Sequence, residues 1–239
     1  MTQSTSGERK EDLYLKLGGN IKCKLVGDAK VGKTSMLLSY HQDEFSSAYD
    51  PTIFDNWSKK VKYNDRMINL LLYDTGGSTE SSQLGQKGNI GTDIFLLCFS
   101  IDDHASFKNI SEKWKLEVEK CYMTENINQL QSSIVDGGSP NLCSDIDCSC
   151  QKPLILLVGC KADMKYLSSI TALRKHSIKG KSSRGPPPIS VQQGEELARE
   201  IGAYKYMECC ARNGTGVNEI FNEAIKAVLN RRENASGLR

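Results

Sequence analysis

The stretch that most constrains the fold is Gly27 to Thr34, which matches the pattern G-x-x-x-x-G-K-[ST]. An apolar run, Ile21 to Val26, leads into it, and a helical segment, Ser35 to Tyr40, follows. Strand, glycine loop and helix in this order are typical of a phosphate-binding loop. Glycines let the backbone wrap a polyphosphate, so that successive N–H groups and the positive end of the helix dipole point at the anion. The pattern predicts that Lys33 reaches the outer phosphates and that Thr34 ligates magnesium.

Composition limits the function classes. Lysine and arginine number 31 against 29 acidic residues, so no overall charge favours nucleic acid, and we expect no nucleic-acid partner. The longest apolar run, near Pro153 to Val158, is far shorter than the roughly 20 residues that span a bilayer. Because several cysteines lie in apolar strand patterns, we interpret them as reduced thiols of a cytoplasmic protein. These cysteines are Cys23, Cys98, Cys160, Cys209 and Cys210.

Alternating and unbroken apolar runs predict strands and helices along the chain. Two strand patterns, Trp57 to Tyr63 and Met67 to Tyr73, face each other across Asn64-Asp65 and predict an antiparallel hairpin. Further along we expect strands at Asp93 to Ser100, Pro153 to Gly159 and Tyr204 to Cys209. We expect helices at Ala105 to Cys121 and at Val217 to Arg231. Another helix should start at Ser190, which forms a capping-box pattern with Gln193.

A second candidate site segment is Asp74 to Gly77, where an acidic residue ends an apolar strand and opens a D-x-x-G turn. A D-x-x-G turn by itself is common in proteins. About forty residues after a phosphate loop, however, it indicates a site for magnesium and phosphate. We predict that Asp74 holds the water shell of magnesium and that the Gly77 N–H meets a terminal phosphate.

The strand ending at Gly159 is followed by Cys160-Lys161-Ala162-Asp163, one residue away from the N/T-K-x-D pattern of GTP-binding proteins. The Asp163 carboxylate can accept two hydrogen bonds from the N1–H and N2–H₂ edge of guanine, which adenine cannot supply. The aliphatic stem of Lys161 can cover the face of the base. Binding of another base would leave this carboxylate buried without a hydrogen-bond partner, so the site rejects that base. The tetrad therefore predicts guanine specificity and disfavours an ATP-dependent protein or kinase.

The order of these segments resembles the small GTPases of the Ras superfamily, and within it the Rho/Rac family. The Rho/Rac resemblance rests on Tyr49 to Asn56, Thr92 to Ser100, Ala105 to Asn109 with Lys113-Trp114, and an extra segment before Ser190. It covers about residues 20–231, leaving tails at 1–19 and 232–239. It implies the α/β fold of the three-layer P-loop NTPase G domain, a six-stranded, mostly parallel sheet with helices on both faces and nucleotide at the carboxyl ends of the strands.

Carried over by position, the resemblance implies GTP or GDP with Mg²⁺ as cofactors. Phe45 would pack on guanine, Thr52 would bind magnesium and the terminal phosphate, and the Ala211 N–H would meet the guanine carbonyl. Magnesium would be held by Thr34, Thr52 and, through water, Asp74, and the catalytic positions would be Lys33, Thr52 and Ser78. The nucleotide-binding positions are Gly27, Asp28, Ala29, Lys30, Val31, Gly32, Lys33, Thr34, Ser35, Phe45, Tyr49, Thr52, Asp74, Gly77, Cys160, Lys161, Asp163, Cys210, Ala211 and Arg212.

Two departures from the family pattern oppose GTP hydrolysis. Ser78 stands where the family places the glutamine that orients the attacking water, and serine is too short to span that distance. Ala29 replaces a glycine of the loop, and its methyl group crowds the space needed by a glutamine or by the arginine finger of a partner. Thr79 or Gln83 could instead substitute for the missing glutamine. Cys160 and Cys210 replace residues that support the guanine-contacting loops.

Two inserted segments extend the common domain. Residues 124–151 contain acidic residues without lysine or arginine, and three cysteines in the spacing C-x₄-C-x-C. This spacing lacks a fourth ligand for zinc, so a flexible loop is favoured over a metal site, with acylation or redox chemistry a further alternative. Residues 164–189 are basic without any acid. They form either a solvated face or a weak electrostatic contact, through residues 165–184, with an anionic membrane or an acidic partner.

These features predict a GTP-binding signalling switch that presents switches I and II to effector proteins and binds exchange factors. Two alternatives stay open: a mainly GTP-bound protein with slow or defective hydrolysis, and an ordinary switch that cycles with exchange and activating proteins. The last six residues, Asn234 to Arg239, contain no cysteine, so we expect no prenyl anchor. We expect a cytoplasmic protein, with at most a peripheral membrane fraction.

Overall fold

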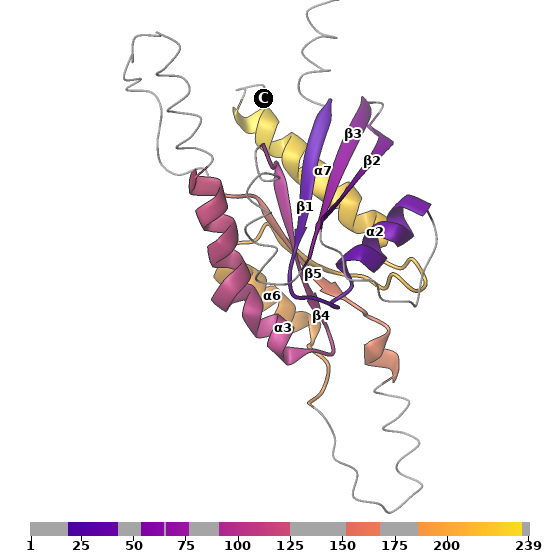
Figure 1. The fold of residues 1–239 in the computed structure, drawn as a ribbon, viewed down its shortest axis with the longest axis vertical. Coiled ribbons are helices and arrows are strands. Elements are labelled where there is room, and N and C mark those ends of the chain that lie inside the picture. Colours follow the sequence, from indigo (N-terminus) through magenta and orange to yellow (C-terminus); the bar gives the residue numbers. More distant parts are fainter. Residues whose placement is uncertain are drawn as a thin grey trace, which may run out of the picture.

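The fold is a single sheet covered by helices on both faces (Figure 1). The computed structural model describes residues 19–42, 54–64, 66–76, 91–124, 152–167 and 186–235. The strands of the sheet are β1 (Asn20–Val26), β2 (Phe54–Tyr63), β3 (Arg66–Thr75), β4 (Ile94–Ser100), β5 (Ile155–Cys160) and β6 (Lys205–Glu208). The helices are α2 (Lys33–Gln42), α3 (His104–Asn109), which runs on as the π-helical turn η3 (Ile110–Trp114), α6 (Val191–Ile201) and α7 (Val217–Ala235).

The strand order confirms the predicted topology. The sheet has six strands in the order β2-β3-β1-β4-β5-β6. Only the β2–β3 pair is antiparallel, with Tyr63 opposite Arg66 across the turn that contains Asn64. The other neighbouring pairs are parallel. The predicted hairpin is therefore confirmed, and both of its strands are longer than their patterns indicated.

Alternation of side chains along the central strands explains why both faces are covered. In β4, Ile94, Leu96 and Cys98 join the core that includes α2 and α7, whereas Phe95, Leu97 and Phe99 join the core that includes α3 and α6. Figure 1 shows α7 on one side of the sheet and α3 and α6 on the other. The five cysteines that lie in or beside apolar strand patterns are all buried.

Helix boundaries follow local capping chemistry. Ser190 caps α6, with its side chain accepting from the Gln193 N–H and the Gln193 side chain accepting from the Ser190 N–H, so the predicted capping box is confirmed. Gly202, in the left-handed region at φ 71°, ends the helix. No helix within the described ranges has both the length and the apolar character needed to cross a membrane.

The segment expected as one α-helix, Ala105 to Cys121, is helical but not uniformly α-helical. It begins at His104, capped by the Asp103 side chain, and the helical residues continue through Thr124. In its middle the Lys115 N–H bonds to the carbonyl of Ile110, five residues back, which defines the π turn η3. The apolar residues Ile110, Trp114 and Val118, each four residues after the last, are all buried.

Candidate nucleotide-binding site

The glycine loop connects β1 to α2 and has the backbone geometry of a phosphate cradle. Gly27 and Gly32 have φ values of 151° and 115°, and Lys30 lies in the left-handed region at φ 65°. A Cβ atom at Gly27 would lie 2.1 Å from the carbonyl oxygen of Cys98 on β4, so only glycine lets the loop approach the sheet this closely. Ala29 and Lys30 form the exposed tip of the loop.

Lys33 lies inside this loop. Its ammonium donates to the carbonyl oxygens of Gly27 at 2.9 Å and Asp28 at 2.7 Å, and the residue is 5 % exposed. Burial lowers the pKa of the Lys33 ammonium, and the nearby Asp74 carboxylate opposes that shift. The side chain is thus placed under the loop, at the position from which the sequence predicts that it reaches phosphate.

Oxygen ligands suited to magnesium meet beside the loop. The Thr34 hydroxyl, at the start of α2, donates to Asp74 Oδ2 on β3 at 2.5 Å, and Asp74 is fully buried. The hydroxyl and carboxylate oxygens near the N-terminus of α2 are ligands of the kind that Mg²⁺ prefers. Two of the residues predicted to hold magnesium therefore lie side by side, and their oxygen atoms fit the ion.

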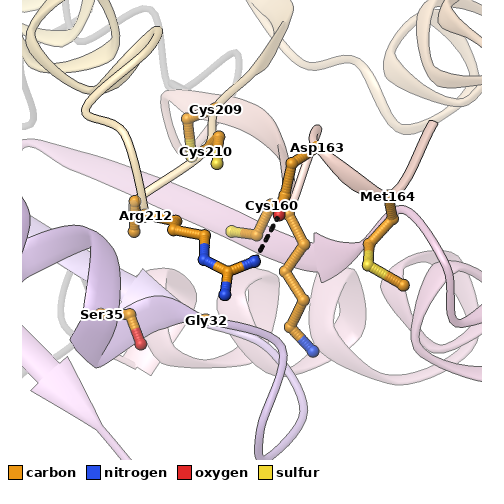
Figure 2. A pocket seen from close by; sticks show the side chains of 10 residues that line it. Gly32, Ser35, Cys160, Asp163, Met164, Cys209, Cys210 and Arg212 are labelled. Carbon is orange, nitrogen blue, oxygen red and sulfur yellow. Dashed lines mark ion pairs between the residues drawn. The ribbon is translucent and has the colours of Figure 1, made fainter. Parts of the chain in front are cut away.

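A pocket next to the loop contains the predicted base-binding residues. Its lining residues are Gly32, Ser35, Cys160, Lys161, Asp163, Met164, Cys209, Cys210, Ala211 and Arg212. Figure 2 shows Asp163 and Arg212 meeting over this space, with their charged groups 3.9 Å apart. The Arg212 side chain is exposed and the Asp163 side chain is partly covered, so this ion pair is weak and a base can replace it. The structure thus brings together two loops that are about fifty residues apart in the chain.

Thiols line the floor of this pocket. Gly32 lies against Cys160, because a Cβ atom at Gly32 would be 3.3 Å from Cys160 Cβ. The thiols of Cys98, Cys160 and Cys209 are all buried in this region. Cys209 Sγ also lies 3.5 Å from Met36 Sδ. Cys160 and Cys210, the two cysteines that replace family residues near the guanine-contacting loops, are both buried in the lining of this pocket.

Some predicted site residues lie outside the described residues: Phe45, Tyr49, Thr52, Gly77 and Ser78. Their roles stay predictions. Sequence reasoning missed Asn109 and Trp114, whose side chains both donate to the Asp28 carboxylate. The pairing joins residues more than eighty positions apart, which no local pattern indicates.

One lysine of the basic segment has an acidic partner within the fold. Lys165, at its start, is bound to the Glu208 carboxylate at 2.5 Å and is partly covered. Glu208 is the last residue of β6, and its negative charge offsets that of Lys165 within the fold. The rest of the stretch that carries the positive charge, residues 168–185, lies outside the described residues.

A protein-family model described as the Ras family matches residues 22–136 and 138–230. The chain belongs to the Ras family. As a Ras-family protein it is a small GTP-binding switch of a class that binds guanine nucleotide with Mg²⁺, hydrolyses GTP and interacts with effectors and regulators. The matched residues include the glycine loop, Thr34, Asp74 and the lining of the base pocket.

Proposed function

We propose that this Ras-family chain is a Rho-like GTPase that hydrolyses GTP slowly and is therefore mainly GTP-bound. The Rho-like assignment is supported by Tyr49 to Asn56, by the segment running into β4, and by the inserted segment before Ser190. Slow hydrolysis is supported above all by Ser78 in place of the glutamine of the family. Ala29 adds to this because it lies at the exposed tip of the loop, where a partner would approach the terminal phosphate.

Binding and hydrolysis depend on different parts of the site. Lys33, Thr34 and Asp74 supply the electrostatic contacts that hold a triphosphate with its metal ion. When magnesium is bound it neutralises charge on the phosphates. Ser78 is too short to orient the attacking water, so the positioning part of catalysis is missing while the binding part is retained.

A second candidate function, an ordinary cycling GTPase, is favoured by the same retained contacts of Lys33 and Thr34. It requires that Thr79 or Gln83 takes over the positioning of water. Both functions use the effector-facing run Asp50 to Asn56, so they differ in how long that surface stays in its GTP form.

The nucleotide carried by the purified protein tests the proposal. We expect denaturation of freshly purified protein to release mostly GTP, identified by chromatography, because turnover of the bound nucleotide is slow. A Lys33→Ala variant is the control and should release little nucleotide. Mostly GDP would support the cycling alternative, and adenine nucleotide would contradict both functions.

We further propose that the protein is cytoplasmic, with a salt-labile membrane fraction held by the basic residues of the segment 165–184. Each Lys or Arg near an anionic membrane contributes about 1 kcal/mol, and salt screens this attraction. We expect any membrane-bound fraction to be released by high salt. Because Lys165 is paired with Glu208, Lys165→Gln should change this fraction little, whereas neutralising Lys175, Lys179 and Lys181 together should abolish it. Retention after a high-salt wash would contradict the proposal.

A further inference from the structure

The carboxylate of Asp28, in the phosphate loop, accepts hydrogen bonds from two side chains of the helix formed by α3 and η3. Asn109 Nδ2 donates to Asp28 Oδ2 at 2.7 Å, and Trp114 Nε1 donates to Asp28 Oδ1 at 2.8 Å. Each carboxylate oxygen therefore has its own donor. Trp114 is 4 % exposed and packs in the core that includes α3 and α6, so its indole is held in place by its surroundings.

The π turn explains how both donors reach one carboxylate. In an α-helix each residue turns by about 100°, so side chains five residues apart diverge by about 140°. In η3 the hydrogen bond from Lys115 to Ile110 spans five residues, which widens the turn. Asn109, just before this turn, and Trp114, at its end, thereby come to the same side of the helix. A regular α-helix over this segment would point one of them away from Asp28.

Asp28 in turn shapes the part of the loop that contacts Lys33. Its backbone carbonyl accepts from the Lys33 ammonium at 2.7 Å, next to the carbonyl of Gly27 at 2.9 Å. On the other side Gly27 is pressed against the Cys98 carbonyl. The first residues of the loop are thus held by three sets of contacts. These come from β4, from the Lys33 ammonium and from the two side-chain donors to Asp28. A loop held in this way keeps its N–H groups aimed at a bound phosphate.

We propose that Asn109 and Trp114 are positioning residues that clamp the phosphate loop through Asp28 and thereby slow the release of guanine nucleotide. The proposal rests on the proposed GTP-binding function and adds a determinant of how long nucleotide stays bound. Hydrogen bonds to a charged carboxylate are stronger than those between neutral groups. Loss of one of them leaves Asp28 free to move, and the loop then opens more often.

The test compares two tryptophan-to-phenylalanine variants of the full chain. Trp114→Phe keeps an aromatic ring in the core but removes the N–H that holds Asp28. Trp57→Phe is the matched control, because the Trp57 indole nitrogen is buried and has no hydrogen-bond partner among the described residues. Release of a fluorescent GDP analogue is measured by chase with excess GDP. We expect release about tenfold faster for Trp114→Phe, and within about twofold of the natural protein for Trp57→Phe.

A double-mutant comparison separates the clamp from a general loss of packing. If Trp114 acts through Asp28, Trp114→Phe should add little to the release rate of an Asp28→Ala variant. Asn109→Ala, at a partly exposed position, should also speed release and should likewise add little in the Asp28→Ala background. This second variant decides the question if Trp114→Phe does not fold.

Two results would overturn the clamp alone: unchanged release from Trp114→Phe and Asn109→Ala, or effects that multiply fully with that of Asp28→Ala. Failure of the natural protein to retain any guanine nucleotide would instead overturn the proposed function, and the clamp with it. The two failures are therefore distinguishable in one set of measurements.

Discussion

A Ser78→Gln, Ala29→Gly double variant is expected to hydrolyse bound GTP on the order of 10²-fold faster than the natural protein in a single turnover. The glutamine restores a group long enough to orient the attacking water. The glycine removes the methyl group at the loop tip and makes room for it. The contacts of Lys33 and Thr34 are the same in both proteins, so nucleotide affinity should stay nearly constant.

The same pair of proteins tests the response to an activating protein that supplies an arginine finger. Such a finger contributes on the order of 10³ to 10⁵ in rate. We expect the double variant to respond and the natural protein to remain slow. The single variants Ser78→Gln and Ala29→Gly separate water positioning from access of the arginine. If the natural protein hydrolyses GTP as fast as the double variant, slow hydrolysis is wrong and another residue positions the water.

Asp163→Asn is expected to shift nucleotide preference from guanine to xanthine. The carboxylate belongs to the lining of the base pocket, where it forms a weak ion pair with Arg212 at 3.9 Å. An amide cannot accept two hydrogen bonds from the guanine edge, but it can donate to the carbonyl that xanthine presents there. Sites built to hydrogen-bond one partner reject an unmatched analogue by about 10⁴-fold or more.

Competition between GTP and xanthosine triphosphate for the fluorescent analogue measures this shift. Glu112→Gln is a suitable control, since it makes the same chemical change on an exposed side chain of η3. It should leave the preference for guanine intact. Equal affinity of the natural protein for ATP and GTP would contradict the role given to Asp163.

Local patterns predicted the parts of the molecule that depend on nearby residues. The hairpin around Asn64 and the cap at Ser190 each involve groups within a few positions of one another. Thr34 and Asp74 were predicted to hold the same magnesium ion, and they lie together next to the carboxyl ends of the parallel strands β1 and β3. Local patterns therefore located the elements, and the topology was predicted by the resemblance to the small GTPases.

The π turn and the support of Asp28 could not be predicted in the same way. Apolar periodicity shows which face of the helix is buried, and one added residue changes that periodicity too little to identify η3. The contact from Trp114 to Asp28 depends on how the helix lies across the loop, which is a property of the packed molecule. Bonds from Lys33 to the carbonyls of its own loop were missed for a related reason, since the pattern relates the lysine only to phosphate.

The strand order also gives the order in which the parts of the site leave the ribosome. After β1, β2 and β3, each later strand lies one place further towards one edge of the sheet, with β4 beside β1, β5 beside β4 and β6 beside β5. The residues of the phosphate loop and Asp74 are therefore synthesised early. Cys210, Ala211 and Arg212 come after β6, just before α7 covers the core beside α2. Because a domain generally folds as a unit, guanine recognition requires nearly the whole chain, although the residues that contact phosphate are among the first to be made.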